Sequence, residues 1–328
     1  MTTLDRRYEI LFVYECQDCN PNGDPLDENR PRTDPETGQA TITDVRIKRT
    51  VRDWFLRREP DVAQRLQEGL EILIRDTAKP DGFLAESKDR AEQFLDWATK
   101  DKKRSEKRQA LESAVLDGCI DARLFGVTLP LGKEETALQL TGPVQFAAFN
   151  RSLHRVVPTL VQQTAAYAGN AKVHQKSFAE RWLVPYALIA AHAVVNEMAA
   201  RTTRMTDADL EWLLQALWKG TANLNTHSKM GHNPLLLLIA SYQPGYRLGA
   251  LTNRLSLTDR TGSDAALRST ADFALDVSSL LAAFQDYKAL IDLRVCQDSR
   301  LRCKAGAYSG SFLELAEQIS LPITAFEY

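Results

Sequence analysis

Three aspartates that could bind a divalent metal lie in one polar segment of the chain. Asp18, Asp24 and Asp34 follow a short apolar run, within a stretch rich in proline, asparagine and glycine. Paired carboxylates in a loop can hold Mg²⁺, which can then assist cleavage of a phosphodiester. Acidic loop residues more often face water or cap turns. A metal-dependent ribonuclease that uses Asp24 and its neighbouring carboxylates is therefore the alternative hypothesis.

Cysteine and histidine spacing gives little support for another metal. Cys16 and Cys19 form one Cys-x-x-Cys pair, but zinc needs about four ligands, and six residues separate Cys296 from Cys303. The five histidines form no tight ligand motif. An odd number of cysteines in a chain that begins without a signal-peptide pattern favours reduced thiols. We therefore expect no metal, no cofactor and no disulfide.

Motifs for nucleotide binding or hydrolysis are also missing. The sequence contains no P-loop, GxGxxG, HExxH or GxSxG pattern. No residue is therefore assigned a catalytic role. The chain has no apolar run long enough to span a membrane, so we expect a cytoplasmic protein.

Charge is balanced overall but divided into local clusters. The 328 residues include 41 Lys and Arg against 43 Asp and Glu, a formal net charge of −2. Residues 44–58, 100–108 and 150–181 each carry four more basic than acidic side chains, whereas residues 16–36 carry four more acidic than basic ones. Bulk charge thus argues against nucleic-acid binding, but separate basic faces permit it.

Hydrophobic periodicity predicts the elements that carry these clusters. Residues 8–16 contain a run of five apolar residues typical of a buried strand, and a polar loop follows to about residue 41. Thr43 is a good N-cap for a helix whose apolar face is formed by Ile47, Val51, Trp54 and Phe55. The opposite face of that helix is basic.

The remaining pattern alternates between strands and helices. We expect a helical insertion over 61–117 with a basic linker at 100–108, strands within 119–129 and 138–149, and a projecting arm over 151–181 that turns near Gly169 and Asn170. A strand over 182–195, a helix capped by Thr206, a strand over 235–242 and a helix over 278–291 complete the chain. This βαββαβ order predicts an α+β, ferredoxin-like fold that includes RNA-recognition-motif domains.

Three of these elements have the chemistry that holds single-stranded RNA. Lys and Arg contact phosphates, and loops that contain glycine can approach the backbone closely. The basic helix and the arm supply charge, and the loop 225–234 adds Lys229 and His232 beside Met230.

Five sequence strings, read in order, resemble one family. NPNGDP, NRPRTDPETG, ITDVRIKRTVRDW, IDARLFG, and LTGPVQF followed by NRSLH are similar to the backbone subunit of type I CRISPR Cascade complexes, the Cas-seven family, and most of all to its type I-B branch. The resemblance is dense over 8–58 and 119–154.

The resemblance implies a palm related to the RNA-recognition motif, with a helical finger insertion and a β-hairpin thumb. The corresponding segments are the first palm half 1–58, the finger 59–117, palm strands 118–150, the thumb arm 151–181, the second palm half 182–245 and a C-terminal segment 246–328.

The resemblance also implies a non-catalytic protein that polymerises along a crRNA guide. Its partners would be the guide, target DNA through guide pairing, neighbouring copies, other Cascade subunits, and a helicase-nuclease or a transposition machinery. Asp121 and Arg123 match the family pattern as either an ion pair or a ligand contact. Taken together with the loop chemistry, the predicted RNA-binding residues are Asn22, Gly23, Arg46, Lys48, Arg49, Arg52, Arg151, Ser152, His154, Lys229 and His232.

Overall fold

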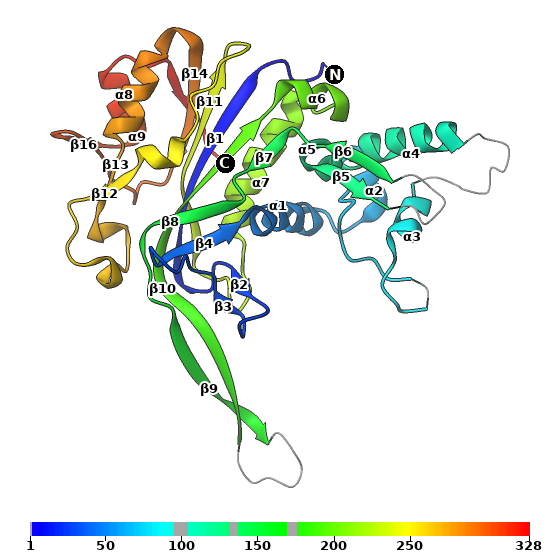
Figure 1. The fold of residues 1–328 in the computed structure, drawn as a ribbon, viewed down its shortest axis with the longest axis horizontal. Helices are drawn as coiled ribbons and strands as arrows, with labels where there is room; N and C mark the ends of the chain where they lie inside the picture. The colour runs from blue at the N-terminus through cyan, green and yellow to red at the C-terminus, as the bar shows by residue number, and fades with distance from the viewer. Residues whose placement is uncertain (1, 80, 95–103, 131–136, 169–175) are drawn as a thin grey trace.

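One large sheet organises the molecule (Figure 1). The computed structural model describes residues 2–79, 81–94, 104–130, 137–168 and 176–328. At the centre of the sheet, β1 (Arg7–Cys19) pairs antiparallel with β10 (Lys176–Val195) on one edge and β11 (His232–Tyr242) on the other. The order β17-β14-β11-β1-β10-β8-β4 includes β4 (Gln39–Thr43), β8 (Phe149–Arg155), β14 (Ile291–Gln297) and β17 (Ile323–Ala325), while β7 (Val144–Phe146) also pairs with β10.

The apolar run of β1 is buried on both faces of the sheet. Ile10, Phe12 and Tyr14 point into one core, and Leu11 and Val13 point into another. A strand with hydrogen-bonded neighbours on both edges and cores on both faces has no solvated side, which explains its continuous apolar sequence. The predicted central strand is confirmed.

Two helices cover the first face of the sheet. In α1 (Asp44–Arg58), the Thr43 hydroxyl accepts a hydrogen bond from the N–H of Arg46, as its N-cap position predicts. The capping box of Thr206 and Asp209 begins α7 (Asp207–Ala222). The short α6 (Glu197–Thr203) precedes α7. The predicted βαββαβ order is present, because α1 follows β1 and α7 lies between β10 and β11.

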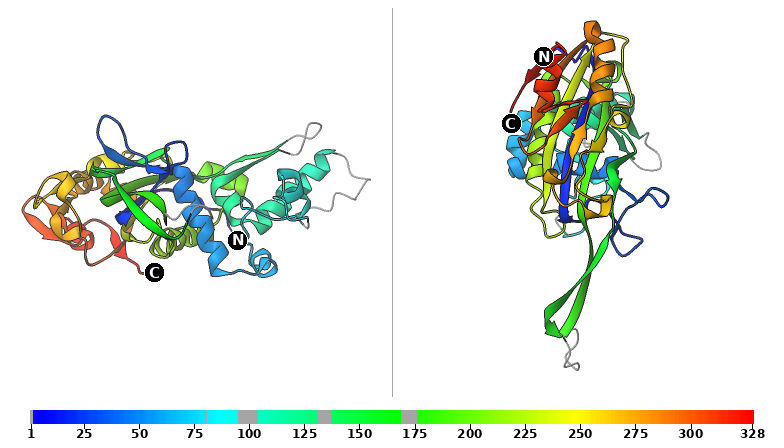
Figure 2. Two further views of the ribbon diagram at one scale, coloured as in Figure 1. Left: turned by 90° about the horizontal axis from the view of Figure 1, so that it is seen from below. Right: turned by 90° about the vertical axis from the view of Figure 1, so that its left-hand side faces the viewer.

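The C-terminal segment packs against the opposite face (Figures 1 and 2). Its helices are α8 (Ser278–Asp286) and α9 (Phe312–Gln318), so the helix predicted over 278–291 ends earlier than expected. It also contains the short helix η1 (Leu251–Arg254) and a small sheet of β12 (Ser256–Thr258), β13 (Ala274–Asp276), β15 (Cys303–Ala305) and β16 (Tyr308–Gly310).

A hairpin projects from the sheet. The first part of β10 pairs with β9 (Thr159–Ala168), and Figure 1 shows this ribbon extending away from the body. The arm predicted over 151–181 therefore begins later, because residues 149–155 form β8 inside the main sheet. The turn predicted at Gly169 and Asn170 lies outside the described residues.

The insertion after α1 has a core of its own. It contains α2 (Val62–Glu68), α3 (Ser87–Glu92), α4 (Arg104–Gly118), α5 (Ile120–Phe125) and the pair β5 (Gly126–Leu129) and β6 (Leu138–Thr141). None of the helices in the described residues is both long and apolar enough to cross a membrane.

Three local predictions about this insertion were wrong. Residues 120–125 form a short helix rather than a strand: Cys119 is its N-cap, and Gly126, with a φ of 76°, ends it. The spacing of Val62, Leu66, Leu70 and Leu73 predicts one helix, but the first helix ends at the left-handed Gly69, which leaves Leu70 and Leu73 beyond it. Residues 104–108 belong to α4 rather than to a basic linker. Residues 95–103 lie outside the described residues.

A buried carboxylate fixes the loop that follows β11. Glu9 is fully buried in β1 and accepts hydrogen bonds from Tyr242 Oη at 2.7 Å, His192 Nε2 at 2.9 Å and the N–H of Gly249 at 3.0 Å. Burial alone would raise the pKa of Glu9, but these hydrogen bonds outweigh it and lower the pKa to about 2. The ionised form is thus the one that the fold stabilises.

Replacing this carboxylate should make stability less dependent on pH. Because the folded pKa lies below the unfolded value, the stabilisation is complete above about pH 5 and is lost as the pH falls towards 2. We predict that Glu9→Gln lowers the free energy of unfolding at pH 7 by roughly 3 kcal/mol. The difference from the unmodified protein should shrink to less than half at pH 3, as measured by urea denaturation.

The matched control is Asp292→Asn, which removes a carboxylate from the exposed ion pair with Arg6. Exposed pairs contribute about 1 kcal/mol or less. Equal losses of stability for the two variants would show that the Glu9 network does not stabilise the loop.

Candidate nucleic-acid interface

At the end of β1, the side chains no longer alternate regularly between the two faces of the sheet. In a strand, residues three apart face opposite sides, yet Cys16 and Cys19 are both buried in the same core. Between them Asp18 has a φ of 48°, in the left-handed region that few residues other than glycine adopt. This reversal turns Cys19 back to the side of Cys16 and directs the chain into the loop that begins at Asn20.

A second loop, 225–231, is fastened to this strand end through its backbone. The N–H of Gln17 donates to the Gly231 carbonyl at 3.0 Å, and the N–H of Asn20 donates to the Ser228 carbonyl at 2.9 Å. Gly231 has a φ of 107°, and a Cβ there would lie 2.1 Å from the Gln17 carbonyl oxygen. Only glycine permits this approach, which brings Lys229 to the start of the first loop.

Two half-buried cations, Arg46 and Lys229, lie near the point where the two loops come together. Arg46 of α1 donates a hydrogen bond to the Thr50 hydroxyl at 2.9 Å, and the Lys229 ammonium donates to the Asn20 carbonyl. Burial lowers the pKa of Arg46. Burial and the nearby Arg46 lower the pKa of Lys229 to about 8. No carboxylate in the described part of the chain forms an ion pair with either cation, so an anion would relieve their repulsion.

The other predicted cations of α1 are neutralised within the protein. Lys48 pairs with Asp44 at 2.8 Å and Arg49 pairs with Asp53 at 2.7 Å, each one helical turn away. Arg52 pairs at 2.8 Å with Asp121 of α5, and its guanidinium lies over the ring of Phe125. These contacts compete with a role in phosphate binding.

Asp121 and Arg123 both fasten the insertion to the sheet layer. Asp121 accepts the N–H groups of Leu73 and Ile74 as well as Arg52. Arg123 forms a two-pronged ion pair with Asp209 at the start of α7. Of the two readings open from the sequence, the geometry favours the structural ion pair.

Four of the predicted contact residues have buried side chains: Asn22, Ser152, His154 and His232. Ser152 accepts the N–H of Ala40 at 2.9 Å, and His154 accepts the N–H of Leu188 at 3.2 Å, so both bind sheet backbone. Asn22 is buried against the Thr41 carbonyl. The burial of these four side chains argues against direct contact with a large ligand, and their role in RNA binding stays a prediction. The backbone of Asn22 still shapes the first loop.

Position 23 requires glycine for a steric reason. A Cβ at Gly23 would lie 2.1 Å from Asn29 Oδ1, so the loop closes tightly between β2 (Gly23–Asp24) and β3 (Arg30–Pro31). The guanidinium of Arg30 lies 4.7 Å from the ring centre of Trp182 and thereby holds this loop against the root of the hairpin.

The loop carboxylates bind arginines rather than one another. Asp24 pairs with Arg32 at 3.0 Å, and Asp34 pairs with Arg151 at 3.5 Å while capping the turn that follows it. These aspartates do not form a metal-binding cluster among the described residues. Within the described residues, the side chains that do lie close enough to share a metal ion are Cys16, Cys19 and His232, which are all buried.

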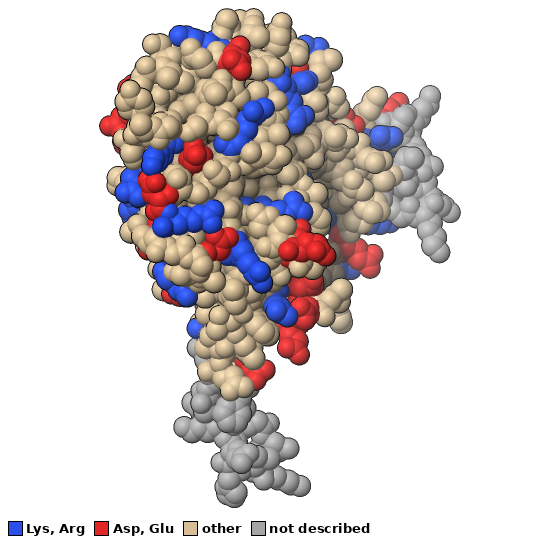
Figure 3. Space-filling view, turned by 60° about the vertical axis from the view of Figure 1, so that its left-hand side comes forward, with Lys and Arg blue, Asp and Glu red and all other residues tan. Residues whose placement is uncertain are grey.

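The surface and its clefts show how charge is distributed. Figure 3 shows Lys and Arg spread over the face above the hairpin, with Asp and Glu gathered beside it.

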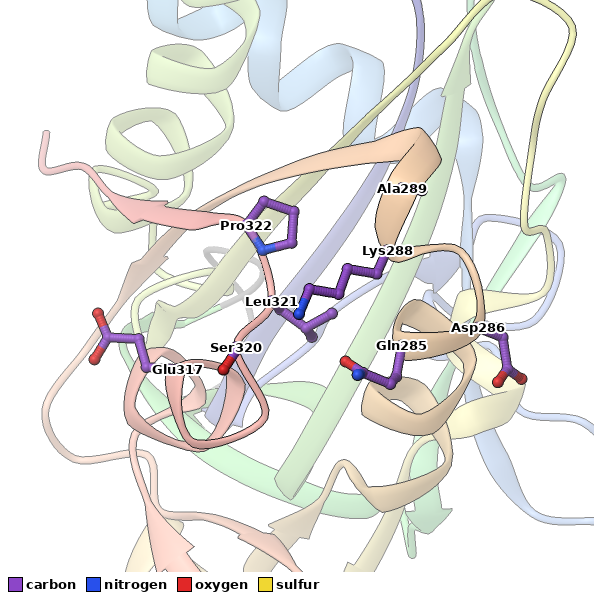
Figure 4. A pocket seen from close by; sticks show the side chains of 8 residues that line it. All are labelled: Gln285, Asp286, Lys288, Ala289, Glu317, Ser320, Leu321 and Pro322. Carbon is purple, nitrogen blue, oxygen red and sulfur yellow. The ribbon is translucent and has the colours of Figure 1, made fainter.

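An open cleft elsewhere, between α8 and α9, includes Lys288 and Leu321, but Asp286 and Glu317 lie at its opposite edges (Figure 4). This cleft has no convergent charged groups and is separate from the cation pair.

Comparison with solved structures defines the class of this fold. The chain is similar to one from a "CRISPR RNA-guided surveillance complex, pre-nicking", with a TM-score of 0.54 and 15% identity over 95% of this chain and 98% of that chain. A chain from another "CRISPR RNA-guided surveillance complex" gives a TM-score of 0.50 and 14% identity, covering 92% and 95%. The architecture is thus a mixed α+β fold found in such complexes.

Sequence comparison identifies the family. Residues 6–278 match the model described as "CRISPR-associated protein Cas7". A protein of that name from Haloferax volcanii is 34% identical, with 93% of this chain and 91% of the relative covered. The chain belongs to the Cas7 family of CRISPR-associated proteins, and the resemblance noted in its sequence is confirmed.

The close approach at Gly231 can be tested by adding one methyl group. We predict that Gly231→Ala lowers the free energy of unfolding by about 3 kcal/mol or more, because the Cβ overlaps the Gln17 carbonyl. Gly245→Ala is the matched control, with a φ of 87° and open space around it, and should cost only about 1 kcal/mol. Similar losses in thermal or urea unfolding would contradict a tight contact at Gly231.

Proposed function

We propose that the chain is a non-catalytic backbone subunit of a type I CRISPR surveillance complex, and that it binds the phosphates of a crRNA guide. Membership of the Cas7 family supports the assignment. The observation that carries the proposed site is the pair Arg46 and Lys229, two half-buried cations that form no ion pair with a carboxylate in the described residues. Such a pair suits a phosphate diester, whose negative charge is permanent.

The surrounding loops suit a guide of any sequence. Backbone hydrogen bonds from Gln17 and Asn20 fasten the loop that carries Lys229, and the Lys229 ammonium adds a hydrogen bond to the Asn20 carbonyl. Contacts to phosphate fix the position of a nucleic acid and carry no base information. A subunit that repeats along a guide of variable sequence needs this property, and target DNA is then read by pairing with the guide.

The division of the fold stays a proposal, with one boundary changed. The sheet with α1 and α7 would be the palm and the β9–β10 hairpin the thumb. The finger expected over 59–117 would extend to β6, because β5 and β6 pair with each other outside the main sheet and are not palm strands. We propose that the hairpin of one copy reaches the guide bound by the next copy. A head-to-tail contact of this kind does not close on itself and generates a helical filament. Other Cascade subunits, and a helicase-nuclease or a transposition machinery, would be its further partners.

Removing the cation pair should weaken RNA binding and flatten its salt dependence. We predict that Arg46→Gln combined with Lys229→Gln lowers affinity for a single-stranded RNA at least about tenfold. The slope of log affinity against log salt should become shallower by about 1.4, because two phosphate contacts are lost. Fluorescence anisotropy across a series of KCl concentrations measures both quantities.

The matched control removes two cations elsewhere. Arg6 and Lys304 form ion pairs with Asp292 and Asp259, so Arg6→Gln with Lys304→Gln removes the same charge from other surfaces. Its affinity and slope should stay close to those of the unmodified protein. If the two double variants behave alike, bulk charge rather than this site determines binding.

The ribonuclease alternative predicts that the protein cuts RNA, whereas the proposed function predicts that it does not. Because Asp24 is paired with Arg32 and not grouped with other carboxylates, we expect purified protein with Mg²⁺ to leave RNA intact. Gel analysis of labelled RNA after prolonged incubation tests this. Cleavage that disappears in Asp24→Asn while RNA binding persists would establish the alternative, and Asp292→Asn serves as the control for loss of one carboxylate.

A further inference from the structure

The described residues contain one group of soft metal-binding side chains, and the proposed RNA site does not use it. Cys16 and Cys19 leave the end of β1, and His232 begins β11, which pairs with it. The donor atoms of the three residues lie within 4.8 Å of one another, and Cys19 Sγ is 3.4 Å from His232 Nδ1. We infer that Cys16, Cys19 and His232 form a zinc site.

The distances suit zinc with little movement. With Zn–S bonds of about 2.3 Å and Zn–N bonds of about 2.0–2.1 Å, a tetrahedral site places a sulfur and a nitrogen ligand about 3.6 Å apart. The observed spacing of 3.4 Å between Cys19 Sγ and His232 Nδ1 agrees with this value. Two sulfurs and one imidazole nitrogen favour Zn²⁺ over Mg²⁺ or Ca²⁺, which prefer oxygen.

The backbone is shaped to bring these three ligands together. The left-handed Asp18 returns Cys19 to the side of Cys16, as zinc-binding Cys-x-x-Cys turns require. Gly231, through its contact with Gln17, sets the start of β11 against the same strand end. Both features are costly for the chain, and a bound metal offers a physical reason for them.

Three protein donors fill three of the four tetrahedral positions, and a water molecule can take the fourth. On binding, both thiols lose their protons to solvent. The proton that His232 Nδ1 shares with the Lys229 carbonyl is given to solvent while Nε2 takes one up, so the imidazole stays neutral and Nδ1 is free to bind the metal. The metal would then tie β1 to β11 directly and hold the loop that carries Lys229. This role does not depend on whether RNA is the ligand of that loop.

The site can be tested on the full chain without RNA. Protein purified under reducing conditions without chelators should contain close to one zinc per chain by mass spectrometry of the metal. Replacement by Co²⁺ should produce the thiolate-to-cobalt absorption of a tetrahedral site. Cys19→Ser and His232→Gln should each weaken zinc binding at least tenfold, since loss of an outer partner alone costs 10–100-fold.

Cys119→Ser is the matched control, because Cys119 is a buried thiol at the N-cap of α5, where serine is well tolerated. It should keep the full zinc content. The cobalt spectrum of the unmodified protein tests the inference even if a ligand variant fails to fold. Absence of both zinc and the thiolate absorption overturns it, as would a Cys16–Cys19 disulfide that leaves two fewer than the five free thiols.

Discussion

Hydrogen bonding of β1 to strands on both of its edges determines where the functional side chains lie. β10 and β11 pair with it along nearly its whole length, so its end is held from two sides. The loops that leave this end, and the loop 225–231 that enters β11, are therefore brought together by the sheet rather than by local sequence. Since β10 continues past the sheet into the hairpin, the same pairing also directs the projecting ribbon.

Charge in this protein serves two separate purposes. Most arginines near the site stabilise the fold: Arg52 and Arg123 bind Asp121 and Asp209, and so fasten the insertion to α1 and α7. Breaking such buried pairs leaves an uncompensated charge, which makes them structural constraints. Arg46 and Lys229 differ because neither forms an ion pair with a carboxylate in the described region. A phosphate can supply the missing charge, and this distinguishes a binding cation from a structural one.

Local sequence patterns predicted the helices and strands better than they predicted the contacts within the candidate RNA interface. The apolar run of β1, the Thr43 cap of α1 and the capping box of α7 each depend on neighbouring residues, and the structure confirms them. The partners that decide function are distant in sequence: Asp121 lies 69 residues from Arg52, and His232 lies 213 residues from Cys19. Periodicity cannot reveal such pairs. It therefore could not show that Lys48 and Arg52 have acidic partners within the protein, or that His232 lies beside the cysteine pair.

The central claim is that RNA phosphates contact the cation pair at the end of β1. The most direct measurement is a high-resolution electron-microscopy structure of the protein with the RNA that copurifies with it. We predict repeated copies along one RNA strand, with phosphate density within hydrogen-bonding distance of Arg46 and Lys229 in each copy. RNA that crosses the opposite face, over α8 and α9, or a preparation that contains no RNA and binds none, would contradict it.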